Sequence, residues 1–325
     1  MIWLYFFVLF LSFAVLFKCA DFFVEGASGI ANVLKIPKVV IGIVLVSLAT
    51  TAPEFGVSVI SSILGDPEIA LGNAVGSVIF DDGVALALAA ILAPAAIMVD
   101  CKLIRVVGLF LLSIDLLAYF LARNGVIGRL EGSLFVLILG LYFFFLLRFE
   151  REKHRRRKKH GFLEEKKHHL ESHRELLKKP VMLFSAGLVG IFVSSLAVHW
   201  SATHISDHFN LSDTIIGLTL VALGTSLPEI STCITAALKG EGEIAVGDII
   251  GADVLNILWI IGVSAIANPI RVQLRTIDFA FPFMILIVLV MLVSMLIRCR
   301  LTKIKGVILL LIYGFYLFLT VKFFM

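Results

Sequence analysis

Charged side chains are scarce in this chain of 325 residues, since Asp, Glu, Lys and Arg make up only 16% of it. Soluble domains usually carry about a quarter. Hydrophobic residues instead make up 60%, and runs of roughly 20 mostly apolar residues, the length that crosses a bilayer, recur along nearly the whole chain. This composition excludes a separate soluble domain and predicts an all-α integral membrane protein.

Cysteine and widely spread basic charge are also lacking. Cys19, Cys101, Cys233 and Cys299 do not have the close spacing of a disulfide framework or a zinc site, and we interpret them as small apolar side chains. Of the 28 Lys and Arg residues, 13 lie within Arg148–Lys179. The net charge of +4 therefore does not indicate a nucleic-acid-binding surface.

Apolar runs that are separated by Gly, Pro and charged residues predict about ten membrane-spanning helices, called spans below. Five lie before the long polar segment, near residues 1–29, 38–64, 69–93, 103–122 and 130–148. Five follow it, near residues 181–204, 213–238, 244–267, 278–297 and 304–324. By the positive-inside rule, the polar segment 149–179 is a cytoplasmic loop, which predicts a multi-pass protein of the cell membrane with extracellular termini. The loop holds five of the eight histidines, and we predict a solvated, partly helical connector that touches anionic lipids, with metal sensing as the alternative.

An internal repeat divides the chain into two halves. Shifted by 175 positions, residues 41–81 align with residues 216–256 without a gap, and 14 of the 41 positions are identical. The identities include a Pro-Glu pair and four glycines. Of these glycines, we expect Gly42, Gly72 and Gly76, with their partners in the second copy, at close contacts between helices. The copies begin five spans apart, an odd number, so the second must cross the membrane in the opposite sense. We therefore predict inverted five-helix repeats in residues 1–148 and 180–325, the architecture of secondary transporters.

Each copy contains a predicted span that is interrupted by a Pro-Glu pair, ending in Glu54 or Glu229. Proline has no amide hydrogen, so a backbone carbonyl about one turn earlier loses its helical donor. Irregular backbone at membrane depth persists only where it is buried in protein or lines a wet cavity, and a bound cation would satisfy it. Thr50 and Thr225 precede the two glutamates by four residues, which places hydroxyl and carboxylate on one helix face.

The next span of each copy adds further oxygen atoms at helical spacing. Ser77 and Asp81 stand in the first copy, and Asn256 stands in the second. Carboxylate, hydroxyl and carbonyl oxygens are the ligands that Ca²⁺ and Na⁺ prefer. An ionised group at the bilayer centre costs about 3 kcal/mol on insertion scales, so these acids need compensating charge. We predict a cation site near the bilayer midplane, where divalent cations, Na⁺ and protons compete.

These motifs resemble the alpha-repeats of the calcium/cation antiporter superfamily, and most closely those of its prokaryotic sodium/calcium exchanger branch. The resemblance covers both repeats and the ten-span plan, and it implies alternating access in which the first and sixth spans slide over the other eight. It implies that Glu54 and Glu229 coordinate Ca²⁺ together with the backbone carbonyls of Ser47 and Ala222. The implied Na⁺ ligands are the side-chain oxygens of Thr50, Thr51, Ser77, Asp81, Thr225, Ser226 and Asn256.

Departures from the family pattern bear on the counter-ion. Ala252 stands where the family usually has Ser, and Asp82 and Asp253 are additional acids whose role the pattern leaves open. The proton-coupled branch has Glu four residues after the Gly of its Gly-Asn motif, where this chain has Gly76. We therefore expect Ca²⁺ to be exchanged for Na⁺ without a prosthetic group, and we keep exchange for H⁺, or K⁺-assisted exchange for Na⁺, as the alternative.

Two rivals belong to other functional classes. An intramembrane protease would need paired Asp residues in a Gly-x-Gly-Asp context or a Ser/His dyad, but Gly247-Asp248 lacks the preceding Gly and His199 has no Ser partner motif. A passive channel would build its filter from symmetric subunits or charged rings, whereas this chain carries both half-sites itself. We therefore predict a transporter, not an enzyme, whose partners are Ca²⁺, Na⁺ and membrane lipids; no pattern indicates an oligomeric state.

Overall fold

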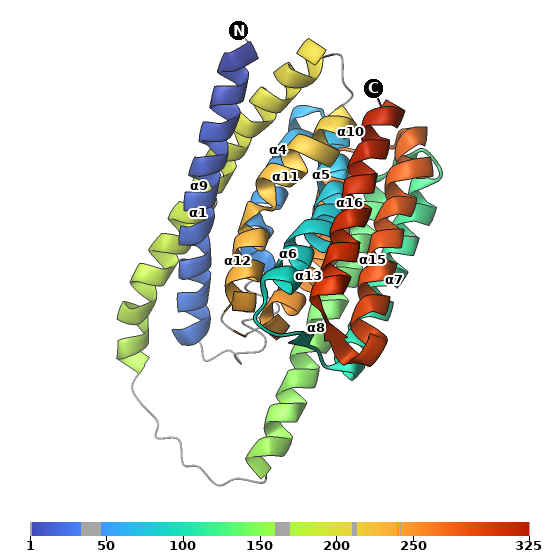
Figure 1. The fold of residues 1–325 in the computed structure, drawn as a ribbon. Coiled ribbons are helices and arrows are strands. Elements are labelled where there is room, and N and C mark those ends of the chain that lie inside the picture. The colour runs from blue at the N-terminus through green and yellow to red at the C-terminus, as the bar shows by residue number, and fades with distance from the viewer. Residues whose placement is uncertain are drawn as a thin grey trace.

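The computed structural model describes residues 2–33, 47–159, 170–209, 213–238, 240 and 242–324, and most of them are helical (Figure 1). The first half contains α1 (Ile2–Val33), α3 (Ser47–Thr50), α4 (Ala52–Leu64), α5 (Pro67–Phe80), η2 (Asp81–Ala85), α6 (Leu86–Leu92), α7 (Cys101–Ala122) and α8 (Arg129–Lys159). The second contains α9 (Leu170–Phe209), α10 (Asp213–Ile216), η3 (Gly217–Val221), α11 (Ala222–Thr225), α12 (Leu227–Leu238), α13 (Gly242–Leu255), η4 (Asn256–Ile261), α14 (Gly262–Ala267), η5 (Thr276–Ala280), α15 (Phe281–Leu296), η6 (Ile297–Cys299) and α16 (Lys303–Phe324).

Six helical segments in the described part of the chain are long and apolar enough to cross a membrane. They are Pro67–Leu92, Ile104–Ala122, Leu176–Phe209, Ile244–Ala267, Thr276–Cys299 and Lys303–Thr320. A seventh is added if the bent pair Gly217–Thr225 and Leu227–Leu238 forms one span. The chain is thus a multi-pass helical membrane protein. The count of about ten spans stays a prediction, partly because residues 38–46 of the second expected span lie outside the described residues.

The basic connector is helical at both of its described ends. Helix α8 continues to Lys159, and α9 begins at Leu170, which agrees with the partly helical connector that the sequence predicts. Residues 160–169, which include three of its histidines, lie outside the described part of the chain. In Figure 1, α8 extends beyond the rest of the bundle at its Lys159 end.

The same succession of elements occurs in both halves. In the first half, α3 is followed by a break at Thr51, then by α4, a left-handed turn at Gly65 (φ 114°), α5 and the π-helical turn η2. In the second half, α11 is followed by a break at Ser226, then by α12, a left-handed turn at Gly240 (φ 77°), α13 and η4. Corresponding breaks, turns and π-helical starts lie 175 residues apart, as in the sequence alignment. Left-handed backbone favours glycine, which explains why both turns carry one.

Proline chemistry explains where these helices are interrupted. Pro53 and Pro228 are the second residues of α4 and α12, where the missing amide hydrogen removes no helical hydrogen bond. A continuous helix through either residue would lose a bond and bring the proline ring against an earlier carbonyl. The segments Gly217–Thr225 and Leu227–Leu238 are accordingly bent by 48° relative to each other. The predicted interruption is present in both halves.

Glycines permit close helix contacts at some of the matched positions. A Cβ on Gly76 would lie 2.8 Å from the carbonyl oxygen of Leu218, and one on Gly217 would lie 2.6 Å from that of Ile69. These two glycines therefore let α5 approach η3, as predicted. Gly247 has no described neighbour within 4 Å of such a Cβ, and Gly42, the repeat partner of Gly217, lies outside the described residues, so the packing of these two glycines stays a prediction.

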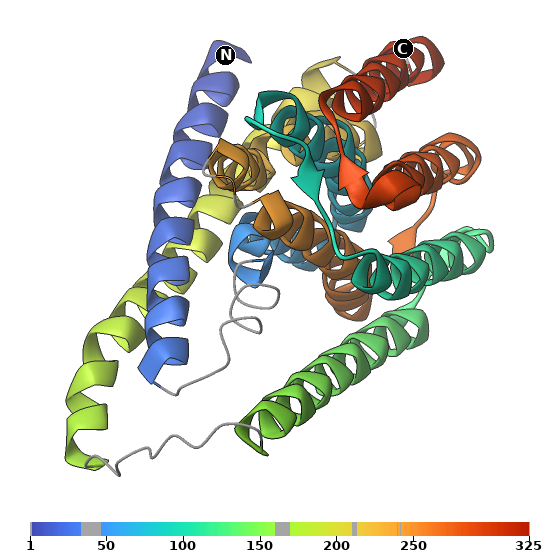
Figure 2. The ribbon, with the colours of Figure 1, turned by 60° about the horizontal axis from the view of Figure 1, so that its bottom comes forward.

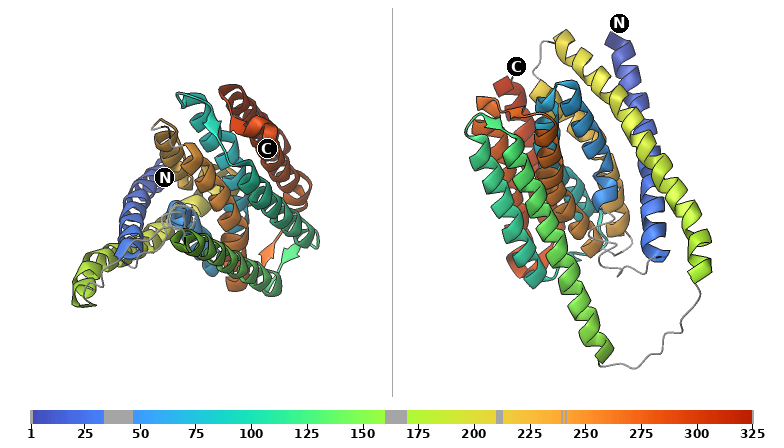
Figure 3. Two further views of the ribbon diagram at one scale, coloured as in Figure 1. Left: turned by 90° about the horizontal axis from the view of Figure 1, so that it is seen from below. Right: turned by 180° about the vertical axis from the view of Figure 1, so that it is seen from behind.

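Helices α1 and α9 lie side by side at one edge of the bundle (Figures 1 and 3). Gly187 of α9 packs directly against the α1 backbone at Cys19 and Phe23. Buried side chains of α1 and α9 form an apolar cluster with residues of α4, α5 and η3, and this cluster is distinct from the larger core of the remaining helices. The pair thus packs onto α4, α5 and η3 through this smaller cluster.

Two short antiparallel strand pairs join segments that connect the helices. Strand β1 (Ile97–Met98) pairs with β4 (Arg300–Leu301), and β2 (Val126–Ile127) pairs with β3 (Ile270–Arg271) (Figure 2). The first pairing brings together Cys101 and Cys299, which form a disulfide across 198 residues of sequence. The interpretation of all four cysteines as apolar side chains is therefore wrong for these two, because tertiary packing rather than sequence spacing makes them neighbours.

Candidate cation-binding site

The helix breaks place both glutamates of the repeat in the first turn of a new helix. Glu54 lies in the first turn of α4 and Glu229 in the first turn of α12. Free amide groups and the positive end of the helix dipole favour an acidic side chain at such a position. Both side chains are nonetheless 1% exposed. The sequence thus directs two carboxyl groups into the protein interior from two interrupted helices.

Hydrogen bonds join the two halves around these breaks. The Ser226 hydroxyl donates to Oε1 of Glu54 at 3.1 Å. Thr225 Oγ1 donates to Oδ1 of Asn73 at 3.2 Å, and Thr50 Oγ1 donates to Oδ1 of Asp248 at 3.3 Å. Each interrupted helix therefore reaches α5 or α13 of the other half. Predicted site residues that are far apart in sequence, Glu54 and Ser226 among them, are brought into direct contact.

Asn73 and Asp248 are the functional candidates that the motif search missed. Asn73 Nδ2 donates to the Glu54 carbonyl at 3.3 Å and to Ser58 Oγ at 2.9 Å, so it holds α5 against the start of α4. The two residues are themselves partners in the repeat, 175 positions apart, and each follows a matched glycine. That register is the sequence signal that could have identified them.

Most predicted side-chain ligands have a buried polar atom without a hydrogen-bond partner among the described residues. Buried polar atoms are normally paired, so such a concentration indicates a missing polar or ionic partner. Carboxylate, hydroxyl and amide oxygens together form the ligand chemistry of hard cations. The unpartnered groups are Oε2 of Glu54, both carboxylate oxygens of Glu229 and Asp81, the side-chain amide of Asn256, and the hydroxyls of Thr51 and Ser77.

Asp81 and Asn256 begin the π-helical turns η2 and η4. A π-helical turn widens the helix and changes which way the following side chains face, and such turns are frequent at functional sites. Both residues are buried, and neither side chain has a hydrogen-bond partner within the described structure. Ala252, one turn before Asn256, is also buried and offers no oxygen.

The two predicted carbonyl ligands already accept hydrogen bonds from their own chain. The Ser47 carbonyl accepts from Thr51 N at 2.9 Å and from Thr50 Oγ1 at 3.2 Å. The Ala222 carbonyl accepts from Ser226 N at 3.0 Å and from Thr225 Oγ1 at 3.4 Å. A cation at either carbonyl would compete with the threonine hydroxyl for the same oxygen.

Further acids lie buried next to this set. The charge of Glu229 interacts with those of Glu54, Asp81 and Asp248. Asp82 and Asp253 form a second buried group with Asp115 of α7, and the charges of the three carboxyl groups interact. Across the described residues, no three His, Cys, Asp or Glu side chains are arranged to hold a metal ion on their own.

His199 has a spatial partner that its sequence context does not reveal. Its Nδ1 lies 3.1 Å from Ser61 Oγ, and its Nε2 lies 3.4 Å from Asp66 Oδ2. The sequence holds no motif for these contacts, because Ser61 and His199 are 138 residues apart. The contacts fasten α9 to the end of α4 and to the turn that precedes α5.

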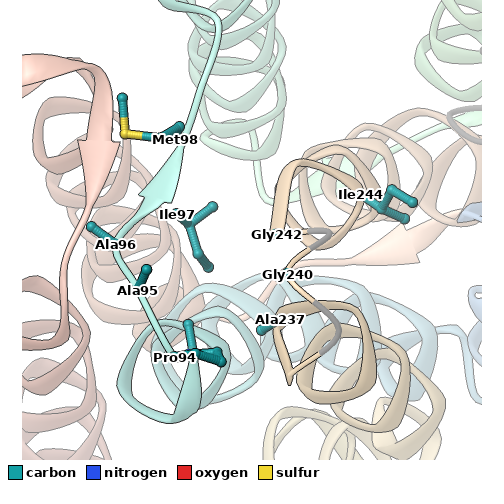
Figure 4. Close-up of a pocket in the computed structure, with 10 residues that line it drawn as sticks. Pro94, Ala95, Ala96, Ile97, Met98, Ala237, Gly240, Gly242 and Ile244 are labelled. Atoms are coloured by element: carbon teal, nitrogen blue, oxygen red, sulfur yellow. The ribbon is translucent and has the colours of Figure 1, made fainter.

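A separate pocket of about 450 Å³ opens beside the connection that follows α6 (Figure 4). It is lined by residues 93–98 and by the end of α12 and the start of α13, including Ala237, Gly240, Gly242 and Ile244. The lining carries no acidic side chain and none of the predicted ligands. This pocket is therefore distinct from the buried carboxyl groups.

Comparisons with known proteins agree with this arrangement. A family model described as sodium/calcium exchanger protein matches residues 4–148 and 179–322. The putative antiporter CaxA of Alkalimonas amylolytica is 36% identical over 250 residues, which cover 77% of this chain and 76% of that protein. The sodium/calcium exchanger MaX1 of Methanosarcina acetivorans is 31% identical over 342 residues, which cover 96% of this chain and 97% of the relative. A solved structure of the sodium-calcium exchanger NCX_Mj, soaked with Na⁺ and Sr²⁺, superposes with a TM-score of 0.65 at 25% identity and covers 98% of this chain and 99% of that one.

Proposed function

Because the chain belongs to the sodium/calcium exchanger protein family, we propose that it exchanges Ca²⁺ for Na⁺ by alternating access at the site between its two interrupted helices. Its relatives are antiporters and exchangers, so the protein is a transporter rather than an enzyme. The observation that carries the proposal is the pair of buried glutamates, Glu54 and Glu229, at the starts of α4 and α12. Their unpartnered oxygens require positive charge in a medium that screens it poorly.

In the proposed site, Ca²⁺ lies between the carboxylates of Glu54 and Glu229. Sodium ions use the side-chain oxygens of Thr50, Thr51, Ser77, Asp81, Thr225, Ser226 and Asn256, and the carbonyls of Ser47 and Ala222 complete the coordination. The Ser226–Glu54 hydrogen bond supports a shared site, because it joins a proposed Na⁺ ligand to a proposed Ca²⁺ ligand at 3.1 Å. Ca²⁺ and Na⁺ that use the same carboxylates cannot both bind there with full affinity. This competition couples the transport of one ion to the transport of the other.

Alternating access requires two parts that move relative to each other. We assign the moving part to α1 and α9, the proposed first and sixth spans of an inverted ten-span plan. Their packing as a pair at one edge of the bundle supports this assignment. The recurrence of breaks, turns and π-helical starts at a spacing of 175 residues supports the inverted repeat.

Calcium flux into vesicles tests the proposal. Purified protein in vesicles should take up ⁴⁵Ca²⁺ when an outward Na⁺ gradient is imposed. Glu54→Gln and Glu229→Gln should each nearly abolish uptake, because the amide keeps the shape of the side chain and removes its charge. Asp278→Asn is the matched control, since Asp278 is an exposed acid outside the site. Full exchange by both glutamine variants would remove the proposed site.

The same vesicles separate the coupling alternatives. A pH gradient in the absence of Na⁺ should not drive uptake if Na⁺ is the counter-ion, and added K⁺ should not change the Na⁺-driven rate. Uptake driven by the pH gradient alone would replace Na⁺ by H⁺ in the proposal. Calcium flux without any counter-transport would instead indicate a channel.

A further inference from the structure

The two halves of the proposed site differ in charge at one position of the repeat. Repeat alignment pairs Asn73 of α5 with Asp248 of α13, 175 residues later. Each accepts a hydrogen bond from the threonine of the opposite interrupted helix: Asn73 from Thr225 at 3.2 Å, and Asp248 from Thr50 at 3.3 Å. The two contacts are equivalent in position and geometry. A neutral amide therefore fills one place and a carboxyl group fills its counterpart.

The Asp248 carboxyl group has an oxygen that the protein does not use. Oδ1 accepts from Thr50, whereas Oδ2 has no hydrogen-bond partner in the described structure, and the residue is 2% exposed. Asn73, in contrast, uses both side-chain atoms, because its Nδ2 donates to the Glu54 carbonyl and to Ser58. A structural role equivalent to that of Asn73 would not leave a buried carboxylate oxygen unpaired.

The charge of Asp248 acts on the same set of acids as the proposed site. It interacts with the charges of Glu54, Glu229 and Asp81. If all four carboxyl groups are ionised, one Ca²⁺ neutralises only half of their charge. Buried charges without compensation are strongly unfavourable, so further cations must occupy the site during the cycle. A hydroxyl beside a carboxylate oxygen is suitable ligand chemistry for Na⁺.

We propose that Asp248 is a further cation ligand of this chain, whose free oxygen together with the Thr50 hydroxyl holds an alkali-metal cation and thereby sets how many monovalent ions move per Ca²⁺. The inference rests on the proposed exchange of Ca²⁺ for Na⁺. It makes α13 the more negative half of the site. Thr50, the last residue of α3, then links this ion to Glu54, which lies across the helix break in the first turn of α4.

Asp248→Asn tests the role of charge without removing the contact. The amide oxygen of Asn can still accept from Thr50, as Asn73 accepts from Thr225, so a merely structural role predicts wild-type behaviour. We expect the variant to exchange Ca²⁺ with one fewer monovalent charge moved per Ca²⁺ and a lower Hill coefficient for Na⁺. The Na⁺ concentration for half-maximal exchange should rise by about 10-fold or more, since a charged partner is lost. Asp248→Glu retains the carboxylate and should keep the wild-type charge per Ca²⁺.

Charge per Ca²⁺ is measured from the membrane potential at which net ⁴⁵Ca²⁺ flux in vesicles is zero. The Na⁺-dependent rise in melting temperature of the purified protein reports binding in parallel. Unchanged Na⁺ dependence and unchanged charge per Ca²⁺ in Asp248→Asn would overturn the inference, and so would failure of this variant to fold while Asp248→Glu folds. Absence of Na⁺-driven Ca²⁺ uptake by the wild-type protein would instead refute the proposed function.

Discussion

Gly224 lies in α11, two residues before the helix break at Ser226, and the ring of Phe13 on α1 occupies the space where a Cβ of this residue would lie. A Cβ at this position would overlap three ring atoms of Phe13. The ring cannot simply swing aside, because Phe13 is 5% exposed and belongs to the apolar cluster of α1 and α9. Gly224→Ala should therefore cost about 1–3 kcal/mol through overpacking, which exceeds the roughly 0.5–1 kcal/mol that alanine contributes to a helix.

A double-mutant cycle with Phe13→Leu measures this contact. We expect Gly224→Ala to lower the free energy of unfolding in mixed micelles and to slow exchange, since α1 is proposed to move past α11. The shorter leucine should accommodate the new methyl group, so the two changes should show a coupling of at least about 0.5 kcal/mol. Gly314→Ala is the control, because no described atom lies within 4 Å of its Cβ position in α16. Additive effects of the two changes, or a Gly224→Ala variant as stable as the control, would refute the packing argument.

Two further predictions concern the other end of the bundle. Lys305 donates three hydrogen bonds of 2.6–2.8 Å to backbone carbonyls around the end of α15, so Lys305→Met should lower the free energy of unfolding by about 1.5–3 kcal/mol. Lys303→Met, at an exposed position, should leave the free energy of unfolding unchanged. Equal stability of the two variants in the same micelle titration would contradict this prediction. The disulfide between Cys101 and Cys299 lies at the end of the bundle that carries the basic connector, the end predicted to face the cytoplasm, where thiols are usually kept reduced. We therefore expect the bond to be reduced in the cell, so that a maleimide reagent labels both cysteines in denatured, freshly acid-quenched cells, whereas the bond should protect both in the purified, oxidised protein. Protection in the cells as well would indicate the opposite orientation.

The central acids of the site could be predicted from sequence because each is fixed by local chemistry. Pro53 and Pro228 end one helix and start the next, and this places Glu54 and Glu229 in a first turn whatever the surroundings. The hydroxyls at Thr50 and Thr225 follow from helical spacing alone. The repeat made these positions visible, since composition by itself does not align a Pro-Glu pair with its copy.

The remaining features depend on contacts between distant segments, for which the sequence carries no local signal. Asn73 meets Thr225, Asp248 meets Thr50 and His199 meets Ser61 across at least 138 residues of chain, and the Cys101–Cys299 bond spans 198. Periodicity says which face of a helix is buried, but not which helix covers it. Such contacts were therefore absent from the sequence prediction or, for the cysteines, predicted wrongly.

The amino-acid sequence by itself determined the membrane environment, the helical class, the two interrupted helices and the glutamates that follow the breaks. These depend on hydrophobicity and on backbone chemistry within one or two helical turns. The tertiary structure decided which oxygen atoms are satisfied by the protein and which remain unpaired in its interior. That distinction, on which the assignment of Asp248 rests, arises only when helices from both halves pack together and exclude water from the groups between them.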